Sequence, residues 1–594
     1  MRVVATAGHV DHGKSTLVRA LTGMEPDRWA EERRRGLTID LGYAWTTLAS
    51  GEQLAFVDVP GHERFIANML AGLGPAPAVL FVVAADEGWC AQSEEHLAAA
   101  DALDIRHGLL AVTRSDLADP AAALDEASAR LARSSLGDVA AVTVSGRTGA
   151  GLPELRAALD RFVAELPAPD PDARVRLWID RAFTIRGSGT VVTGTLAAGT
   201  VAVGDELELD GRRVQVRELQ SAGRSHGRLG PVARVALNLR GVSHHEVRRG
   251  DVLLAPGAWH RTATADVRIT CDEELPAELL LHIGTAAVPV RLRPLGPGLA
   301  RVTLPRPLPL QVGDRAVLRD PGRHAVTGAL VLDADPPALT RRGAAARRAA
   351  ELRDRHARPD AAAELARRGA VRRSHLQALG IPVENLDGAR EVAGWLIAAP
   401  TWRDWVTAAP DAVAGWATRE PLDPAMPTAA LARALRLPDP ALVGPLVAAA
   451  GLTVRAGRVQ AASTPTSLGP AEAGVAAIEQ RLHDEPFAAP DSDELARHRL
   501  GRRELAAAER AGRLLRISPE IVLLPSAPDI AVERLRTLPQ PFTTSQARQA
   551  LGTTRRVAIP LLEYLDAQHR TERVDPTTRR VPDTGEAAAD LGDT

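Results

Sequence analysis

The spacing of hydrophobic and polar positions changes twice along the chain. Up to about residue 165, short apolar runs alternate with longer amphipathic segments. Strands that alternate with helices predict a parallel α/β domain, which we place at residues 1–168. Its expected strands after the N-terminal one are Leu54–Val59, Val79–Ala84, Gly108–Val112 and Val139–Val144.

The second pattern begins after the proline-rich linker Leu166–Asp172. Short strands are separated there by turns centred on glycine and aspartate, such as Val203-Gly-Asp. Strands of this length and spacing are typical of antiparallel barrels or sandwiches. The segment is long enough for two such domains, and we predict two antiparallel β-barrels at residues 172–260 and 261–337.

The third pattern, from residue 340 to 594, is rich in Ala, Arg and Leu and mostly helical. A loose repeat runs through it, because the apolar markers Ile397, Val459, Val522 and Val581 are 62, 63 and 59 residues apart. A period of about 60 residues is too long for the common solenoids and favours winged helix-turn-helix modules. We predict an all-α and winged-helix array of four tandem modules at approximately 340–402, 425–463, 470–526 and 530–583.

Composition narrows the class of protein. The 594 residues are 45% hydrophobic and 25% charged, and the net charge of −2 excludes binding to nucleic acid through gross positive charge alone. The two cysteines cannot form a disulfide framework, and no apolar run approaches the roughly 20 residues of a membrane span. We therefore expect a cytoplasmic monomer without a membrane partner. Of the 72 basic side chains, Lys14 is the single lysine.

The first chemical motif is the segment Gly8–Ser15, which has the pattern G-x-x-x-x-G-K-[ST]. An apolar strand precedes it and a helical segment, Thr16–Leu21, follows it, which is the context that a phosphate-binding loop requires. Its backbone N–H groups wrap phosphates, Lys14 reaches the β and γ oxygens, and Ser15 offers a hydroxyl to Mg²⁺. The nucleotide-binding residues expected here are Gly8, Asp11, His12, Gly13, Lys14, Ser15 and Thr16.

Two further segments complete the expected phosphate site. Asp58 ends the second apolar strand, where its carboxylate can hold Mg²⁺ through water, and Gly61 can turn its N–H toward a γ-phosphate. Thr38 lies between the two motifs, in the basic segment 32–40, and can complete the Mg²⁺ shell in the triphosphate state. The predicted metal ligands are thus Ser15, Thr38 and, through water, Asp58.

Recognition of the base is expected after the next two strands. Asp116, in the segment Thr113-Arg114-Ser115-Asp116, can accept from the N1–H and 2-amino groups of guanine. Ser145 and Gly146 follow the last strand, where a backbone N–H can support the guanine O6. We therefore predict GTP and GDP as the ligands.

These motifs together resemble those of translational GTPases of the elongation factor Tu class. The resemblance implies that His62 is catalytic and orients the attacking water, and that Val10 and Leu37 form a hydrophobic gate around it. It also exposes a departure: the base-recognition element of GTPases is Asn-Lys-x-Asp, whereas this chain has Thr113 and Arg114 in its first two places.

The later segments narrow the resemblance. Ile179–Thr195 and Ala236–Val242 are similar to the tRNA-binding barrel of that class, and the chain then continues into helix-turn-helix modules. This combination resembles the bacterial selenocysteine-specific elongation factors, the SelB family. The resemblance implies as partners selenocysteyl-tRNA, the ribosome at UGA codons and an mRNA selenocysteine insertion hairpin. It also implies a selenocysteine pocket lined by Asp180, Arg181 and Arg234.

The last predicted module carries the expected RNA contacts. Residues 541–580 hold seven arginines against four acids, a local excess that suits a small RNA-hairpin reader. By the same resemblance, arginines contact phosphates and a glutamine reaches a loop base. These residues are Gln546, Arg548, Arg555, Arg556 and Arg573. Two alternatives stay open at this point: a general aminoacyl-tRNA carrier, and a GTPase-switched DNA-binding regulator.

Overall fold

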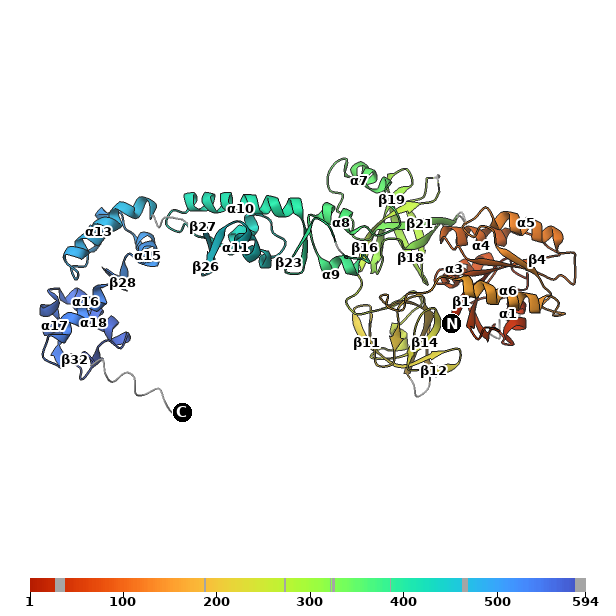
Figure 1. The fold of residues 1–594 in the computed structure, drawn as a ribbon, viewed down its shortest axis with the longest axis horizontal. Coiled ribbons are helices and arrows are strands. Elements are labelled where there is room, and N and C mark those ends of the chain that lie inside the picture. The colour runs from red at the N-terminus through yellow and green to blue at the C-terminus, as the bar shows by residue number, and fades with distance from the viewer. Residues whose placement is uncertain are drawn as a thin grey trace. The chain divides into compact units, whose positions relative to one another are not determined.

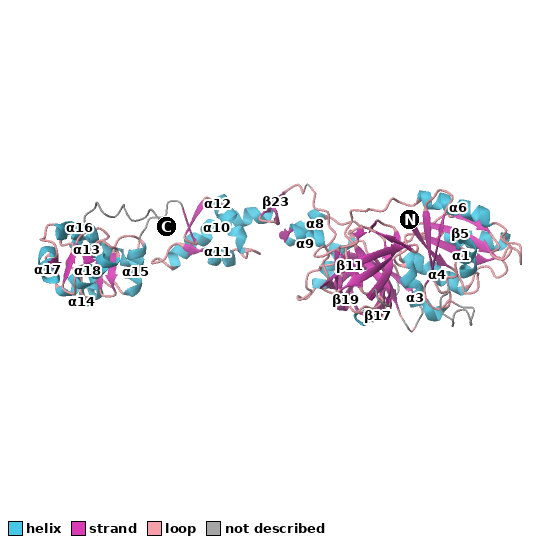
Figure 2. Ribbon diagram, turned by 90° about the horizontal axis from the view of Figure 1, so that it is seen from below, coloured by secondary structure: helices cyan, strands magenta, loops and turns pink. Residues whose placement is uncertain are grey.

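The computed structural model divides into two compact units. The N-terminal unit comprises Met1–Arg367 with Val371–Asp387, and the C-terminal unit comprises Arg368–Ala370 with Gly388–Thr594. Figure 1 labels the helices and strands of both units, and Figure 2 separates helices from strands by colour. The structure describes residues 1–26, 38–185, 189–271, 274–320, 322, 326–384, 386–461 and 468–582.

The first domain of the N-terminal unit is a six-stranded sheet in the order β2-β3-β1-β4-β5-β6. The strands are β1 (Arg2–Ala7), β2 (Gly42–Thr47), β3 (Gln53–Asp58), β4 (Val79–Ala84), β5 (Gly108–Thr113) and β6 (Ala140–Thr143). The helical elements are α1 (Lys14–Thr22), η1 (Glu63–Phe65), α3 (Ile66–Leu73), α4 (Ala91–Ala102), α5 (Ala121–Leu131) and α6 (Leu152–Glu165).

The sheet is mixed rather than wholly parallel. The α/β prediction is confirmed, but β2 was not predicted, and it pairs antiparallel with β3 in the register Tyr43↔Val57. A two-strand hairpin joins β2 to β3, so no crossover helix is needed between them. Tyr43 and Ala44 of β2 are buried in the two cores of this domain, whereas Thr46 and Thr47 are polar, so the strand has no uninterrupted apolar run.

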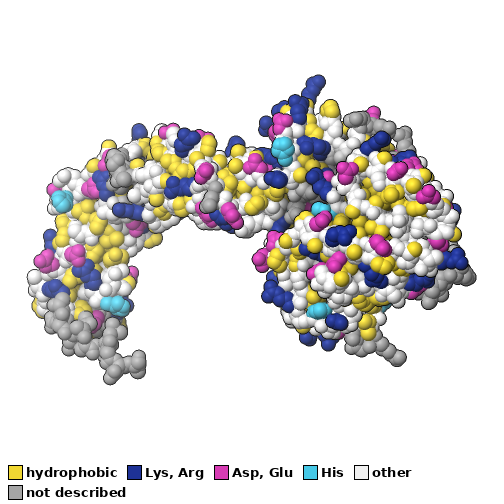
Figure 3. Space-filling model, turned by 45° about the vertical axis from the view of Figure 1, so that its right-hand side comes forward, with side chains coloured by type: hydrophobic (Ala, Val, Ile, Leu, Met, Phe, Trp, Pro, Cys, Tyr) yellow, Lys and Arg dark blue, Asp and Glu magenta, His cyan; other side chains and the backbone are white. Residues whose placement is uncertain are grey.

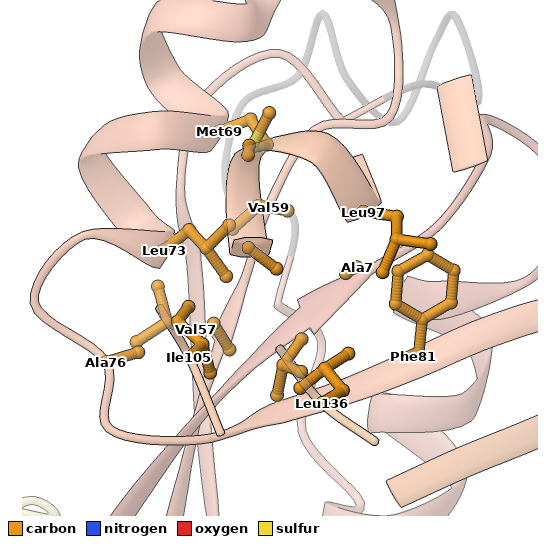
Figure 4. Close-up of a cluster of buried hydrophobic side chains, with 14 of the residues drawn as sticks. Ala7, Val57, Val59, Met69, Leu73, Ala76, Phe81, Leu97, Ile105 and Leu136 are labelled. Atoms are coloured by element: carbon orange, nitrogen blue, oxygen red, sulfur yellow. The ribbon is translucent and has the colours of Figure 1, made fainter. Parts of the chain in front are cut away.

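The core of this domain lies on both faces of the sheet. Alternate residues of β1 point to opposite faces, as the period of two requires: Val3 and Ala5 join one cluster, and Val4 joins the other. Helices α3, α4 and α5 cover the first face, and α1 and α6 cover the second. Figure 4 shows part of the first cluster, in which Phe81 of β4 lies near Leu97 of α4.

Two closed barrels follow, which confirms the predicted pair of β-barrels. The first closes as β10-β15-β7-β8-β14-β11, with β11 paired back to β10 and β12 added at its edge. Its strands are β7 (Arg176–Ile185), β8 (Gly189–Leu196), β10 (Glu206–Leu209), β11 (Arg212–Ser221), β12 (Arg224–His226), β14 (Ala233–Arg240) and β15 (Val252–Leu254). Outside this ring lie β9 (Val201–Ala202), β13 (Arg228–Leu229) and η2 (His244–Glu246).

The second barrel closes as β16-β19-β18-β17-β20-β21. Its strands are β16 (Thr262–Ile269), β17 (Glu278–Ile283), β18 (Ala286–Gly296), β19 (Leu299–Leu308), β20 (Arg315–Arg319) and β21 (Val326–Asp333). In β18 the even-numbered residues Ala286, Val288 and Val290 are buried inside the barrel, and the alternate positions are exposed. This alternation is the pattern from which a barrel strand is predicted.

A buried ion cluster attaches α7 (Ala344–Arg353) to the second barrel. The Arg348 guanidinium is 2% exposed and donates from Nε to the Asp266 carboxylate at 2.7 Å, and it also pairs with Asp333. The same unit continues through α8 (Ala361–Arg368) as far as Arg367, and then from Val371 through α9 (Arg373–Ala378) to Asp387. The short strand β22 (Ala370–Arg372) lies between these helices and begins at Ala370, which is assigned to the C-terminal unit. The segment predicted as the first winged module, 340–402, is therefore divided between the two units.

The C-terminal unit consists of helices with short antiparallel hairpins, and a winged-helix region was predicted here. The predicted markers Ile397, Val459 and Val522 lie in hairpin strands and are buried, and Val581 follows the last hairpin. The division into four modules stays a prediction. The hairpin strands of the C-terminal unit are β23 (Ala389–Val392), β24 (Trp395–Ala398), β25 (Met426–Pro427), β26 (Leu452–Arg455), β27 (Arg458–Ala461), β28 (Leu515–Ser518), β29 (Ile521–Leu523), β30 (Phe542–Thr543), β31 (Glu572–Arg573) and β32 (Thr578–Arg580).

The helices of this unit pack into apolar cores of their own. They are α10 (Ala399–Arg419), α11 (Thr428–Ala434), η3 (Pro440–Leu442), α12 (Val443–Ala449), η4 (Gly469–Ala471), α13 (Glu472–Asp484), α14 (Ser492–Arg497), α15 (Arg502–Arg510), α16 (Ala527–Arg536), α17 (Thr544–Leu551) and α18 (Arg555–Ala567). No helix among the described residues has both the length and the apolar character needed to cross a membrane. On the face drawn in Figure 3, basic and acidic side chains are interspersed.

Candidate functional site

The phosphate loop, Gly8–Ser15, joins β1 to α1 and curls around the Lys14 side chain. Asp11 and Gly13 have φ angles of 63° and 81°, in the left-handed region that a tight loop of this kind uses. Lys14 is 6% exposed, and its Nζ donates to the carbonyls of Gly8 at 2.9 Å and His9 at 2.6 Å. An ammonium held at this point, at the N-terminus of α1, creates a site for an anion.

The three predicted metal ligands lie together beside this loop. The Ser15 Oγ donates to the Asp58 carboxylate at 2.6 Å and lies 2.9 Å from the Thr38 Oγ1. Thr6 donates to the other Asp58 oxygen at 2.7 Å and accepts from the N–H of Val59, so that the carboxylate is fixed in orientation. Two hydroxyls and a carboxylate are hard oxygen donors, and this set fits Mg²⁺.

Gly61 and His62 follow β3 on the same side of the sheet. A Cβ at Gly61 would lie 2.5 Å from the Lys14 Nζ and 2.6 Å from the Val10 nitrogen, so only glycine allows this approach. The His62 Nδ1 accepts from the N–H of Arg64 at 3.2 Å and caps η1. The imidazole is half-buried, and it acts as the N-cap of η1, the short helical turn that follows it. Of the predicted gate, Val10 contacts this region and Leu37 lies outside the described residues.

The residues predicted to bind the base lie beside the phosphate loop. Thr113 donates from Oγ1 to the His12 carbonyl at 2.7 Å, and Arg114 donates to the Asp11 carbonyl. Gly146 packs closely against α1, because a Cβ at this position would lie 3.3 Å from the Thr16 Cγ2. The remaining two predicted residues differ in accessibility: Ser145 is buried and Asp116 is exposed.

Arg114 is anchored by two carboxylates that follow β4. It donates to Asp86 at 2.9 Å and to Glu87 at 2.6 Å. Burial alone would lower the pKa of Arg114, but the hydrogen bonds to both carboxylates outweigh this effect and raise it. The arginine that replaces the expected lysine is thus held against the loop by a pair of acids.

Two buried histidines, one within the phosphate loop and one beside it, have lowered pKa values. Burial, together with the neighbouring His9, lowers the pKa of His12 to about 4. Burial also lowers the pKa of His96, whose Nδ1 accepts from the N–H of Gly8 at 3.1 Å. Both imidazoles are therefore neutral at neutral pH, and they add no charge to the phosphate site.

The predicted pocket residues meet at the contact between the first barrel and β2. Asp180 is 5% exposed and forms a two-point ion pair with Arg234, of which one hydrogen bond measures 2.7 Å. Arg234 lies over the Tyr43 ring at 3.8 Å, and Arg181 lies over the same ring at 5.4 Å. Burial alone would lower the pKa of Arg234, but the Asp180 carboxylate outweighs it and the pKa is raised.

A cavity of about 210 Å³ adjoins these arginines. Four aromatic side chains and both arginines contribute to its walls, beside small and polar residues. A cavity that combines aromatic side chains with guanidinium groups suits a small anionic group with an apolar stem. Its lining includes Tyr43, Trp45, Phe56, Arg181, Phe183, Thr193 and Arg234.

The predicted RNA contacts in the C-terminal unit have different surroundings. Arg555, at the start of α18, and Arg573, in β31, are exposed. Arg556 is exposed as well, and it also donates to the carbonyls of Ala489 at 2.8 Å and Pro490 at 3.3 Å. The remaining two lie on α17: Arg548 is half-buried, and the Gln546 side chain accepts from the N–H of Thr543 and closes a capping box.

Comparisons with known proteins match three parts of the chain. The model described as "Elongation factor Tu GTP binding domain" matches residues 1–165. "Selenocysteine-specific elongation factor, beta-barrel domain" matches 263–338, and "Elongation factor SelB, winged helix" matches 533–581. A crystal structure of a bacterial selenocysteine-specific elongation factor, EF-Sec, superposes with a TM-score of 0.77 at 25% identity over 98% of this chain and 100% of that chain. The chain therefore resembles the SelB elongation factors in its second barrel, its last winged helix and its overall fold.

Two curated selenocysteine-specific elongation factors are similar to part of this chain. The selenocysteine-specific elongation factor of Desulfomicrobium baculatum is 40% identical over 344 residues, and that of Escherichia coli K12 is 38% identical over 347 residues. These alignments cover 53% of both chains in the first case and 56% of both in the second. The chain thus spans about half the length of the curated SelB relatives that it matches.

The sequence motifs do not include several residues of this site. Thr6 and His96 belong to no sequence motif. Thr6 orients Asp58 and His96 accepts from Gly8, and each contact joins residues that are distant in the sequence. Tyr43 lies on β2, the strand that was not predicted. Asp86 and Glu87 could have been found, because acids that follow a buried strand gather at the carboxyl edge of the sheet.

Proposed function

We propose that this chain is a monomeric GTPase that binds selenocysteyl-tRNA in its GTP form and delivers it to the ribosome at UGA codons. We further propose that the C-terminal winged-helix region tethers it to an mRNA selenocysteine insertion hairpin. The observation that carries the proposal is the presence, in one compact unit, of a phosphate site and a two-arginine pocket built on Asp180.

The phosphate site supports GTP hydrolysis. Phosphoryl transfer depends mainly on positioning and on stabilising charge at the γ-phosphoryl oxygens. Lys14 contributes fixed positive charge, and Ser15, Thr38 and Asp58 would hold Mg²⁺, which neutralises phosphate charge when bound. His62 orients the attacking water, as in other members of the elongation factor Tu class.

The pocket supports selection of selenocysteine by charge. A selenol is a stronger acid than the thiol of cysteine, whose pKa is about 8.5, so selenocysteine is an anion at neutral pH whereas serine is neutral. Asp180 is committed to Arg234, and this pair has no net charge. Arg181 lies beside it with its guanidinium over the same tyrosine and supplies the excess positive charge. Asp180 therefore acts by orienting Arg234.

The test compares two aminoacyl forms of one tRNA. With GTP, the purified protein is expected to protect selenocysteyl-tRNA from deacylation more strongly than seryl-tRNA. Arg181→Ala should remove most of this preference while GTP binding stays within about threefold. Arg212→Ala, at an exposed ion pair of the same barrel, is the matched control. Equal protection of both forms by the wild type would contradict the proposal and favour a general aminoacyl-tRNA carrier.

The tethering proposal rests on Arg555 and Arg573, which are exposed at the start of α18 and in β31. The full-length protein is expected to retain members of a library of short RNA hairpins, and Arg555→Ala with Arg573→Ala should weaken retention about tenfold or more. Arg503→Ala, an exposed change on α15, is the control. Retention of duplex DNA in preference to RNA would favour the DNA-binding regulator.

A further inference from the structure

Arg249 connects the first barrel to the α/β domain through three hydrogen bonds. Its Nε donates to the main-chain oxygen of Asp180 at 2.9 Å, and one terminal nitrogen donates to the Asn68 Oδ1 at 2.7 Å. The other terminal nitrogen donates to the Asp40 carboxylate. The guanidinium therefore uses its planar fork to hold three separate segments at fixed angles.

The two partners of Arg249 in the α/β domain lie on segments that adjoin the phosphate site. Asp40 is two residues beyond Thr38, whose hydroxyl lies 2.9 Å from Ser15. Asn68 lies on α3, the helix that follows Gly61 and η1, and its Nδ2 donates to the Ile39 carbonyl at 2.8 Å. A rearrangement of Thr38 or of the start of α3 would therefore displace the groups that Arg249 holds.

The partner of Arg249 in the barrel belongs to the pocket. The Asp180 carboxylate holds Arg234 and accepts from Thr193 at 2.7 Å, so its main-chain position sets the place of the pocket wall. The next residue, Arg181, donates to the Leu41 carbonyl at 3.1 Å and lies 3.6 Å from Asp40. The segment from Thr38 to Leu41 therefore contacts both the metal ligands and the pocket.

We propose that Arg249 is a positioning residue that couples the state of the nucleotide site to the shape of the amino-acid pocket. This inference rests on the proposed function and deepens it. When Thr38 is held at the phosphate site, Asp40 and Asn68 hold Arg249, and Arg249 holds Asp180. The coupling is reciprocal. If the bound nucleotide changes the affinity of the pocket for its ligand by a given factor, the bound ligand changes the affinity for that nucleotide by the same factor.

The first experiment needs no tRNA. Hydrogen exchange is measured on full-length protein with GDP and with a non-hydrolysable GTP analogue, and peptides from β7 and β14 are compared. Wild-type protein should exchange these peptides at least threefold more slowly with the GTP analogue, and Arg249→Met should abolish the difference. Arg212→Met, which removes an exposed arginine of the same barrel, should keep it. A difference that persists in Arg249→Met, or that is absent in the wild type, overturns the inference.

The second experiment measures the coupling itself. The ratio of selenocysteyl-tRNA affinities with the GTP analogue and with GDP is expected to fall at least tenfold in Arg249→Met. Because Asp40 and Arg249 act in one chain of contacts, Asp40→Asn added to Arg249→Met should lower the ratio no further. Two independent, multiplying losses would overturn the inference. Failure of the wild type to prefer selenocysteyl-tRNA refutes the proposed function alone, because the exchange experiment still decides the coupling.

Discussion

Replacement of the single lysine by arginine tests whether the phosphate loop requires a compact ammonium. Lys14 is 6% exposed and bonds to the Gly8 and His9 carbonyls, while Gly61 closes over it so nearly that a Cβ would lie 2.5 Å from Nζ. A guanidinium keeps the charge, but it is wider and planar and does not fit between these groups.

The expected cost of Lys14→Arg follows from these contacts. Overpacking a filled site costs about 1–3 kcal/mol, and losing a hydrogen bond to a charged group costs about 1.5–3 kcal/mol. The sum, about 4 kcal/mol, corresponds to a loss of roughly a thousandfold in nucleotide affinity. Titration with a fluorescent GDP analogue and single-turnover hydrolysis of GTP measure the loss directly.

The control is Arg19→Lys, the reverse exchange on the same helix α1. Arg19 is 56% exposed and pairs only at the surface with Glu25, so its replacement should leave nucleotide affinity within about threefold. Circular dichroism and thermal unfolding establish that both variants fold. If Lys14→Arg binds nucleotide within tenfold of the wild type, the geometric argument is wrong and any cation serves in the loop.

Three further predictions follow from the site. Gly61→Ala places a methyl group 2.6 Å from a main-chain nitrogen of the phosphate loop and should lower the rate of GTP hydrolysis at least tenfold. Gly227→Ala, whose methyl group would lie in open space, is the control and should leave the rate unchanged. Equal rates in the two variants would refute the close approach. The pKa of His12 is about 4 when folded and 6.5 when unfolded, so its contribution to stability is complete above pH 6.5 and is lost as pH falls toward 4. The loss is about 3 kcal/mol in thermal unfolding of nucleotide-free protein, and His12→Gln should flatten that slope. Arg234→Leu strands the buried Asp180 carboxylate and should destabilise the first barrel by about 3–5 kcal/mol, measured by hydrogen exchange; recovery is expected when Asp180→Asn is added, and no recovery would show that the pair is not the cause.

The sequence predicts well the features that depend on local spacing. The phosphate loop, the Asp58 segment and the order of buried strands follow from residues close together in the chain, and the structure brings Ser15, Thr38 and Asp58 within hydrogen-bond distance. Each of these segments has a local pattern of its own, although the contacts join residues that are 23 and 43 positions apart. Their catalytic and binding roles stay predictions.

Features that depend on distant partners could not be predicted in the same way. Arg249 and Arg348 look like any surface arginine in a chain with so many, yet one bonds across to Asp40 and the other is buried on Asp266. β2 was missed because an antiparallel edge strand lacks the long apolar run of its buried neighbours. Arg556 was expected to meet RNA, and its bonds to the Ala489 and Pro490 carbonyls became visible only in the folded unit.

The confinement of the one ε-amine to the phosphate loop gives the protein an unusual chemical surface. Reagents that acylate lysines, and enzymes that acetylate or ubiquitinate them, have a single ε-amine to find in this sequence, and it is 6% exposed. Acylation of that amine adds one mass increment to the intact protein. Measured with and without bound nucleotide, the increment would report occupancy of the loop without any engineered label.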